Sequence, residues 1–430
     1  MRRQFFCSLP LILAVALEGT VTFTAKSQES NPPAGGDALT VEAAVRLALA
    51  NNPELRALAA DVTAAQGESV TVRTWDNPEI AVTPGAFRDS QGAWGHAGVD
   101  LNQTILFPGK RALMRAVAEK NVETRRLALT GFRAQLAIQV RRAFTELLAA
   151  RQIVALKQQQ VTLAKTFVAA AEKKVQAGYA PEFEQTKAEA EMTVAQKALH
   201  EAEAQVAVAA TELNSLTGRK PDAPLVLTGN LNENIPLPDQ SALLTKAVEM
   251  NPGVKVQLAE VERTGLNIAL TRKSRWPDFT VGPTIDYQEP EQLYGFGISL
   301  PLPLWDKKKG AIATATAEQQ RALAELDTLR RDILRQASRA WQQLNAAQES
   351  MAIYTPEFRR KLKSAMDAAA QGYSEGRTPL LLYLETQRTY FDTQADYLDI
   401  LKKLNEAWAE LESAAGIPLD PSLKTTLDSK

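Results

Sequence analysis

Residues 278–302 have the sequence DFTVGPTIDYQEPEQLYGFGISLPL, and this stretch is the strongest indication of the fold. Apolar side chains alternate with small or polar ones in two runs, residues 278–288 and 294–302. A period of two is typical of a β-strand with two different faces. Each run also has the length of a transmembrane β-strand, which needs roughly 9–11 residues. The stretch therefore predicts a β-hairpin with one apolar face.

The apolar face of this hairpin is the candidate lipid-facing surface. Its members are Phe279, Val281, Ile285, Tyr287, Phe296, Ile298 and Leu300. A second hairpin is expected near residues 80–105, where Val99, Leu101 and Ile105 alternate with polar residues and Gln103 interrupts the apolar face. A soluble, half-buried sheet would alternate in the same way, so the pattern alone leaves that alternative open.

The two hairpins belong to two copies of one unit. Several landmarks recur at an offset of 198 or 199 residues: Asn52-Pro53 and Asn251-Pro252, Pro78-Glu79 and Pro277-Asp278, Gly178 with Pro181 and Gly376 with Pro379. A constant offset of this length indicates one ancestral unit fused to its copy. Each copy should contain a short helix, a medium helix, two strands, a very long helix and a second long helix.

The repeat sets the expected division of the chain. Residues 1–27 read as a signal peptide of uncertain cleavage site, because Arg2 and Arg3 precede a short apolar run. The first repeat should cover residues 37–218, and a linker rich in proline and asparagine residues 219–239. The second repeat should cover residues 240–418, followed by a tail at 419–430.

Very long helices dominate both copies. Residues 109–177 contain no proline, and valine or leucine recurs every seven residues at Val140, Leu147, Val154, Val161, Val168 and Val175. This heptad seam predicts close helix packing. The second copy repeats the seam, including Leu323, Phe358 and Ala365, and Pro356 should kink its helix near residues 352–355. Both helices should end at glycine turns, with proline in the first turn of the next helix.

Neither catalysis nor nucleic-acid binding is expected. The formal net charge is −1, so no global field attracts nucleic acid. Lys110 follows Pro108-Gly109 without the upstream glycine of a nucleotide-binding loop, and the second histidine expected after His200-Glu201 in a zinc protease is Ala204. His96 is expected to face a barrel lumen. No catalytic residue, metal site or cofactor is therefore predicted.

With these features in view, the chain resembles the TolC-like outer membrane efflux protein family over residues 37–418. The motifs that carry the resemblance are Leu106-Phe107-Pro108-Gly109-Lys110-Arg111 after the first hairpin and the two glycine turns. The Pro-Gly-Lys-Arg run and Pro356 resemble the cobalt-zinc-cadmium resistance branch of this family.

The resemblance implies a mainly α fold with a small β part. Three identical subunits would share a 12-stranded transmembrane β-barrel above an α-helical tunnel. The four predicted strands per chain are consistent with a shared barrel, since four strands cannot close a barrel alone and open sheet edges are not tolerated in lipid. The implied location is the bacterial outer membrane, extending into the periplasm. Implied partners are outer-membrane lipid, a periplasmic adaptor and an inner-membrane pump of the resistance-nodulation-division type.

Two candidate sites follow from the resemblance. The adaptor would dock at the turns, formed by Gly178, Tyr179, Pro181, Gly376, Arg377, Thr378 and Pro379. Family members carry two acidic residues past each turn, and these positions fall on Leu382 and Glu385 in one copy and on Glu184 and Lys187 in the other. Glu385, with Glu184 as second candidate, would line the channel constriction. The alternative is an ordinary solvated helix face.

Two other classes of protein remain as alternatives. A coiled-coil scaffold would explain the heptads but neither the signal nor the strands. A periplasmic adaptor is built around one helical hairpin with separate β domains, whereas this chain places two short β-hairpins symmetrically in two copies.

Overall fold

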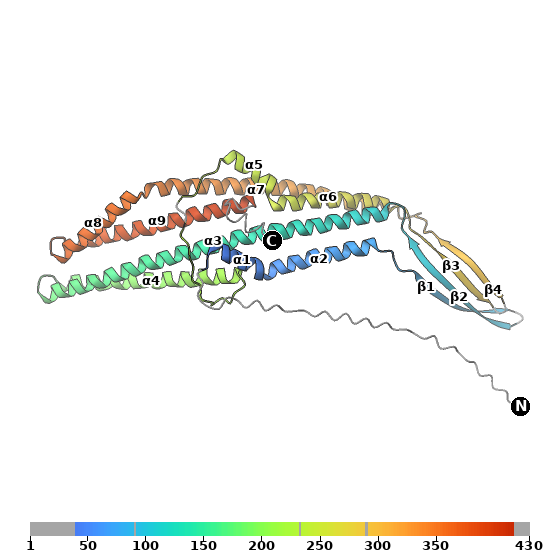
Figure 1. Cartoon of the computed structure of the whole chain (residues 1–430), viewed down its shortest axis with the longest axis horizontal. Coiled ribbons are helices and arrows are strands. Elements are labelled where there is room, and N and C mark those ends of the chain that lie inside the picture. Colours follow the sequence, from blue (N-terminus) through green and yellow to red (C-terminus); the bar gives the residue numbers. More distant parts are fainter. Residues whose placement is uncertain (1–38, 90–91, 232–233, 289–290, 417–430) are drawn as a thin grey trace, which may run out of the picture. The chain divides into compact units, whose positions relative to one another are not determined.

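The computed structural model describes residues 39–89, 92–231, 234–288 and 291–416. The predicted signal peptide and C-terminal tail lie outside the described residues. The described part forms one compact unit of helices with a single sheet (Figure 1). No described helix is both long and apolar enough to cross a membrane.

Both copies show the predicted order of elements, which confirms the mainly α fold with a small β part. The first copy contains α1 (Val41–Asn51), α2 (Pro53–Arg73), β1 (Glu79–Asp89), β2 (Gly92–Ile105), α3 (Lys110–Gln176) and α4 (Glu182–Leu216). The second contains α5 (Gln240–Met250), α6 (Pro252–Lys273), β3 (Phe279–Gln288), β4 (Glu291–Ser299), α7 (Lys309–Ile353), α8 (Pro356–Ser374) and α9 (Leu380–Ala415).

The recurring Asn-Pro pairs separate the short helix from the medium one. The Asn52 side chain accepts hydrogen bonds from the backbone N–H groups of Glu54 and Leu55, and Pro53 is the first residue of α2. Asn251 and Pro252 play the same parts at α6. An asparagine cap followed by proline satisfies the free N–H groups of a helix start, which explains why the pair appears in both copies.

The long helix of the first copy follows its prediction closely. α3 has 67 residues and is about 100 Å long at 1.5 Å per residue. Leu136, Val140 and Leu147 of its seam are buried against α1 and α4. Phe144, which is fully buried in the same cluster, lies outside the heptad positions. The buried apolar stripe of α3 is therefore wider than the two seam positions of each heptad.

The second seam is partly wrong. Leu326, Ile333, Ala337 and Leu344 are buried, but Leu323, Phe358 and Ala365 are exposed. For Phe358 and Ala365 the reason is the break before Pro356: α7 ends at Ile353, and Thr355 caps α8 by accepting a hydrogen bond from the Phe358 N–H. Leu323 lies within α7, where Ala322 and Leu326 are the buried neighbours. The predicted interruption is thus confirmed, and it shifts the buried face of α8 away from the heptad positions.

The four strands form one antiparallel sheet in the order β1-β2-β3-β4. The two hairpins pair with each other through β2 and β3, which brings the two copies together. β4 ends at Ser299, so the predicted strand end at residue 302 is wrong, and Leu300 lies just beyond the strand. Pro301 and Pro303 follow at once, and a residue without an N–H cannot extend the hydrogen-bonded ladder.

Candidate functional site

The sheet has one apolar face that crosses all four strands. Val82, Val99, Ile285 and Tyr294 form one row of Cα partners, and their exposed fractions range from 39% to 69%. Directly opposed residues of an antiparallel pair project to the same face. Val281 pairs with Ile298 on that face, next to Pro283 and Phe296. The described part of the chain therefore leaves a wide apolar surface uncovered.

The opposite face carries small and polar residues. Asp100, Thr284 and Gly295 form one row, and Thr104, Thr280 and Ser299 another. Leu293 is the apolar exception among the described side chains. Gly282 has a steric role, since a Cβ there would collide with the Leu101 carbonyl oxygen of β2. The sheet thus has the two-faced character of a strand layer between an apolar and an aqueous medium.

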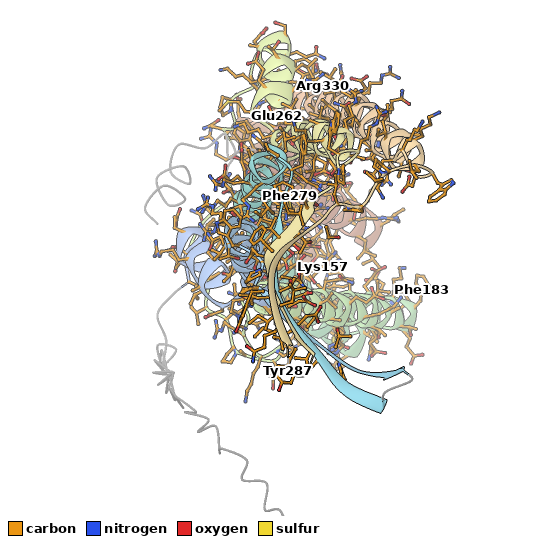
Figure 2. The ribbon with its side chains drawn as sticks, turned by 90° about the vertical axis from the view of Figure 1, so that its right-hand side faces the viewer. Lys157, Phe183, Glu262, Phe279, Tyr287 and Arg330 are labelled. Carbon is orange, nitrogen blue, oxygen red and sulfur yellow. The ribbon has the colours of Figure 1, made fainter. Side chains whose placement is uncertain are left out.

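The predicted lipid-facing residues fall on this apolar face, with Leu300 as the exception beyond the strand end. Phe279 begins β3 next to the helices, and Tyr287 lies near its other end (Figure 2). The backbone of His96 lies in β2, opposite Gln288, but its side chain is outside the described residues.

The two glycine turns lie side by side (Figure 1). Gly178 and Gly376 adopt left-handed backbone angles, φ 74° and φ 78°, that other residues rarely adopt. Pro181 and Pro379 stand at the N-caps of α4 and α9, one residue earlier than predicted. Tyr179 is exposed, whereas Thr378 packs back against Gly372 and donates its N–H to the Gly372 carbonyl oxygen. The glycine turns of both copies therefore lie at the same end of the helices.

An aromatic cluster joins the helices just behind the turns. The rings of Phe167 from α3, Tyr373 from α8 and Tyr383 from α9 lie 5.2–5.4 Å apart, centre to centre. Lys174 of α3 donates to the Tyr373 carbonyl oxygen at 2.5 Å and lies 3.6 Å from the centre of the Tyr373 ring. The two helical hairpins are thus held together by contacts between copies.

The two candidate acids have different surroundings. The Glu184 carboxylate accepts a hydrogen bond from the Tyr373 hydroxyl at 3.1 Å, and burial together with that carboxylate raises the pKa of Tyr373 to about 12. Glu385 is exposed on α9 and forms no ion pair with another described residue. The Glu184 carboxylate therefore links the two helical hairpins, whereas the Glu385 carboxylate is exposed to solvent.

Sequence reasoning missed Tyr373 and its partners. The available signal was weak: Tyr373 lies three residues before Gly376, and Val175 occupies the matching place in the first copy. Nothing in the linear sequence pairs a tyrosine of one copy with a glutamate 189 residues earlier.

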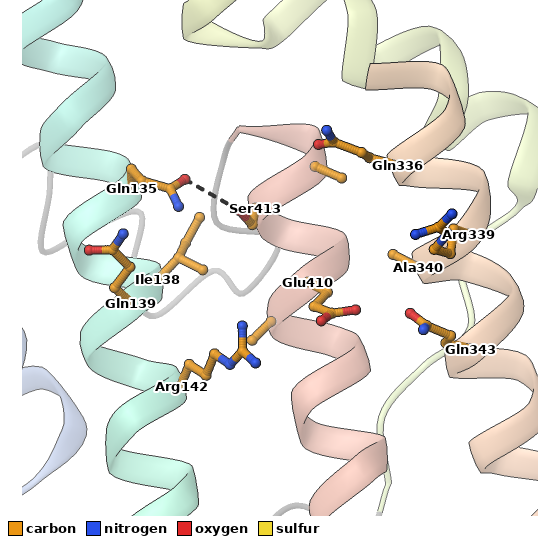
Figure 3. A pocket seen from close by; sticks show the side chains of 12 residues that line it. Gln135, Ile138, Gln139, Arg142, Gln336, Arg339, Ala340, Gln343, Glu410 and Ser413 are labelled. Atoms are coloured by element: carbon orange, nitrogen blue, oxygen red, sulfur yellow. Dashed lines mark hydrogen bonds between the residues drawn. The ribbon is translucent and has the colours of Figure 1, made fainter. Parts of the chain in front are cut away.

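A pocket of about 310 Å³ lies between α3, α7 and α9 (Figure 3). Its lining includes Gln135, Arg142, Arg339, Glu410 and Ser413, and the Ser413 hydroxyl donates a hydrogen bond to the side-chain oxygen of Gln135 at 3.3 Å. Beside it, Arg141 and the fully buried Glu412 form a 2.7 Å ion pair that links the two copies. The pocket is partly open to solvent, and its lining mixes polar and apolar side chains.

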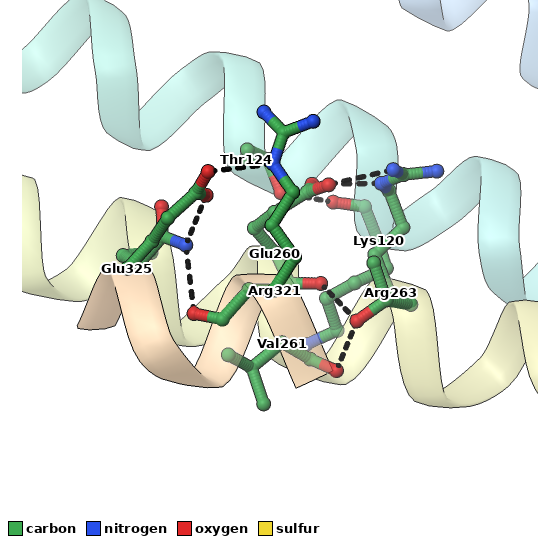
Figure 4. A network of polar contacts seen from close by, with 10 residues as sticks. Lys120, Thr124, Glu260, Val261, Arg263, Arg321 and Glu325 are labelled. Atoms are coloured by element: carbon green, nitrogen blue, oxygen red, sulfur yellow. Dashed lines mark hydrogen bonds and ion pairs between the residues drawn. The ribbon is translucent and has the colours of Figure 1, made fainter. Parts of the chain in front are cut away.

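Nearer the sheet, charged side chains link α3, α6 and α7 (Figure 4). Lys120 contacts Glu123 and Glu262, and its pKa is raised by these hydrogen bonds. The Gln257 side chain donates to the Ala322 carbonyl oxygen, joining α6 to α7. Within the described residues, no group of three or more His, Cys, Asp or Glu side chains gathers closely enough to hold a metal ion. The contacts of this region are structural.

Paired helical hairpins, joined to a sheet with one apolar and one polar face, define a channel-forming class of outer-membrane protein. The family model for outer membrane efflux proteins matches two separate stretches of the chain, residues 44–219 and 243–417. The chain belongs to the outer membrane efflux protein family. It is an outer-membrane channel subunit of an efflux system, and it extends into the periplasm.

Individual relatives agree with this assignment. The chain is 28% identical to the cobalt-zinc-cadmium resistance protein CzcC of Cupriavidus metallidurans, over 97% of this chain and 100% of the relative. It is 25% identical to the outer membrane efflux protein BepC of Brucella suis, over 80% and 76% of the two chains.

Solved structures share the fold. The outer-membrane channel OprN superposes with a TM-score of 0.76 at 16% identity, over 88% of this chain and 90% of that one. CusC superposes with a TM-score of 0.74 at 16% identity, over 88% and 92%.

Proposed function

We propose that three copies of this chain assemble into one channel through a continuous sheet. The observation that carries the proposal is the four-stranded sheet with two open edges, β1 and β4, and a wide apolar face. Unpaired backbone groups at a sheet edge are costly in lipid, so the strands must close with strands of other copies. Three copies would supply 12 strands, whereas one copy has too few for a barrel.

We further propose that a periplasmic adaptor binds the glycine turns and connects the channel to an inner-membrane pump, of the resistance-nodulation-division type. In support, α3 extends about 100 Å by its length, so the turns lie far from the sheet. Exposed Tyr179 offers an aromatic ring there, and Arg377, which is paired with Glu375, is exposed as well. No chemistry beyond passage is proposed, and the chain would act without catalysis of its own.

Cysteine crosslinking tests the turns as the docking surface. We expect Tyr179→Cys and Arg377→Cys to crosslink to the adaptor encoded with this protein, because both side chains are exposed at the turns. The only cysteine of the chain, Cys7, lies in the predicted signal peptide, so the background should be low. Val208→Cys, exposed on α4 far from the turn, is the control. Crosslinks at residue 208 with none at the turns would place the adaptor elsewhere.

We propose divalent transition-metal cations as the exported cargo. Two relatives are named for metal resistance: CzcC, and the nickel-cobalt-cadmium resistance protein NccC of Alcaligenes xylosoxydans at 26% identity over 66% of this chain. BepC, named only for efflux, favours organic small molecules as the second candidate. Deleting the gene should lower tolerance to zinc, cobalt or cadmium and leave tolerance to organic dyes unchanged. The reverse pattern would favour the second candidate.

Charge at the constriction provides the next prediction. Exposed Glu385 would be brought near a common axis in three copies, where carboxylates attract cations at low salt. We expect Glu385→Gln to reduce cation preference in single-channel recordings at low ionic strength without affecting assembly. Glu249→Gln, an exposed acid at the end of α5, should leave the preference unchanged. Unaltered selectivity in assembled Glu385→Gln channels would leave Glu184 as the acidic candidate.

A further inference from the structure

Four chain segments cross between the helices and the sheet, and together they form a distinct surface (Figure 1). They are residues 73–79, 105–111, 272–279 and 300–309, and we call this surface the junction collar. Trp75, Trp276 and Trp305 all lie in it and are exposed, and Trp305 is 91% exposed. Large exposed indole rings are costly in water, so some other medium or molecule should meet them.

Contacts between the segments give the junction collar a defined structure. The Phe107 ring stacks on the Trp276 ring at 5.4 Å, which joins the two copies. Asp278 accepts hydrogen bonds from the Phe107 N–H at 2.9 Å and from the Lys110 ammonium at 2.6 Å. The Arg111 guanidinium lies 4.2 Å from the centre of the Trp75 ring. These contacts fix the positions of Trp75, Phe107 and Trp276 in three of the four segments.

The junction collar is strongly basic. Its four segments contain nine Lys or Arg residues and four Asp or Glu residues. Three of the cations form ion pairs: Arg73 with Glu119, Lys110 with Asp278, and Lys308 with Asp306. The other six pair with no described carboxylate, and four of them are exposed: Arg272, Arg275, Lys307 and Lys309. Their charge is therefore available to an anionic partner.

Apolar and basic side chains are layered along residues 300–309. Leu300, Leu302 and Leu304 are exposed in the part next to β4, and Trp305 follows them. Asp306 and then three lysines, Lys307 to Lys309, come after it, toward α7. Tryptophan and lysine favour the boundary between hydrocarbon and water, where the ring is half buried and the ammonium reaches the headgroups. The order of residues matches a bilayer crossed from its acyl chains to its headgroups.

We propose that the junction collar binds the phosphate headgroups of anionic phospholipids in the leaflet facing the periplasm. The proposal rests on the proposed function, because it requires the apolar face of the sheet to lie in the membrane. The exposed leucines and tryptophans contact the glycerol region, and Arg275, Lys307 and Lys309 contact the phosphodiesters. A basic side chain at an anionic bilayer surface contributes roughly a fivefold gain in affinity at low salt.

The test compares lipids retained by the assembled full-length protein. The wild type and the variant Arg275→Gln/Lys307→Gln/Lys309→Gln are reconstituted into nanodiscs of phosphatidylcholine mixed with phosphatidylglycerol. Native mass spectrometry of the released particles then counts the bound lipids of each kind. We expect the wild type to retain phosphatidylglycerol preferentially, and the variant to lose that preference roughly tenfold or more. The control Lys165→Gln/Arg360→Gln/Lys363→Gln removes exposed, unpaired cations of α3 and α8 and should behave as wild type.

Two results would overturn the proposal. One is equal retention of phosphatidylglycerol by the wild type and the collar variant. The other is a loss of subunit assembly in the variant with unchanged lipid preference, which would show that a neighbouring copy covers the collar. Failure of the proposed function looks different, because the wild type would then not enter these nanodiscs as an assembled particle.

Discussion

Ile285→Arg is expected to destabilise the membrane-inserted assembly by about 2–4 kcal/mol, whereas Thr284→Arg should have a much smaller effect. Ile285 lies in the middle of β3, and its Cα partners Val99 and Tyr294 share its apolar face. An arginine on that face would be placed in hydrocarbon. Thr284 is the preceding residue, on the polar face beside Asp100, where an added cation meets water and a carboxylate.

The two variants form a matched pair, because they add the same side chain to adjacent positions of one strand. The measurement is the fraction of assembled protein after insertion into lipid vesicles, followed as a function of denaturant. Equal losses for both variants would mean that the apolar face is not the lipid-facing one. A larger loss for Thr284→Arg would reverse the two faces of the sheet.

Arg141→Ala is expected to lower the free energy of unfolding by about 3–5 kcal/mol, because it leaves a buried carboxylate without its ion-pair partner. Glu412 has no exposed surface, and its carboxylate lies 2.7 Å from the Arg141 guanidinium. This pair joins α3 of the first copy to α9 of the second. Loss of this ion pair should therefore weaken the packing of α3 against α9, and with it the contact between the two copies.

Arg142→Ala is the control for this prediction, since Arg142 is exposed and is the next residue in the chain. Its effect should stay within about 0.5 kcal/mol. The double variant Arg141→Met/Glu412→Leu removes both charges and should recover most of the lost stability. Denaturant titration in detergent provides the values. A loss for Arg141→Ala no larger than that for Arg142→Ala would show that the pair contributes little.

Features with a strong local signal were predictable from the sequence. The Asn-Pro caps, the glycine turns and the break before Pro356 each depend on the backbone preferences of one or two residues. The strands of the second copy also followed from alternation alone. The end of β4 was misplaced because the alternating pattern continues to Leu302, whereas the ladder stops where the prolines begin.

Contacts between the copies were not predictable from one sequence. The pairing of β2 with β3, the hydrogen bond from Tyr373 to Glu184 and the ion pair of Arg141 with Glu412 all join residues far apart in the chain. Periodicity indicates which face of an element is buried and does not indicate its partner. The heptad positions Phe358 and Ala365 failed for a related reason, since the break before Pro356 turns α8 relative to α7.

The mass of the membrane-extracted particle tests most directly whether several copies of the chain close one sheet. The mature protein, purified in mild detergent, should give a complex of three subunits by mass measurement corrected for detergent. Heating should convert that complex to the single chain. A monomer that stays folded and soluble without detergent would contradict the shared sheet and the channel built upon it.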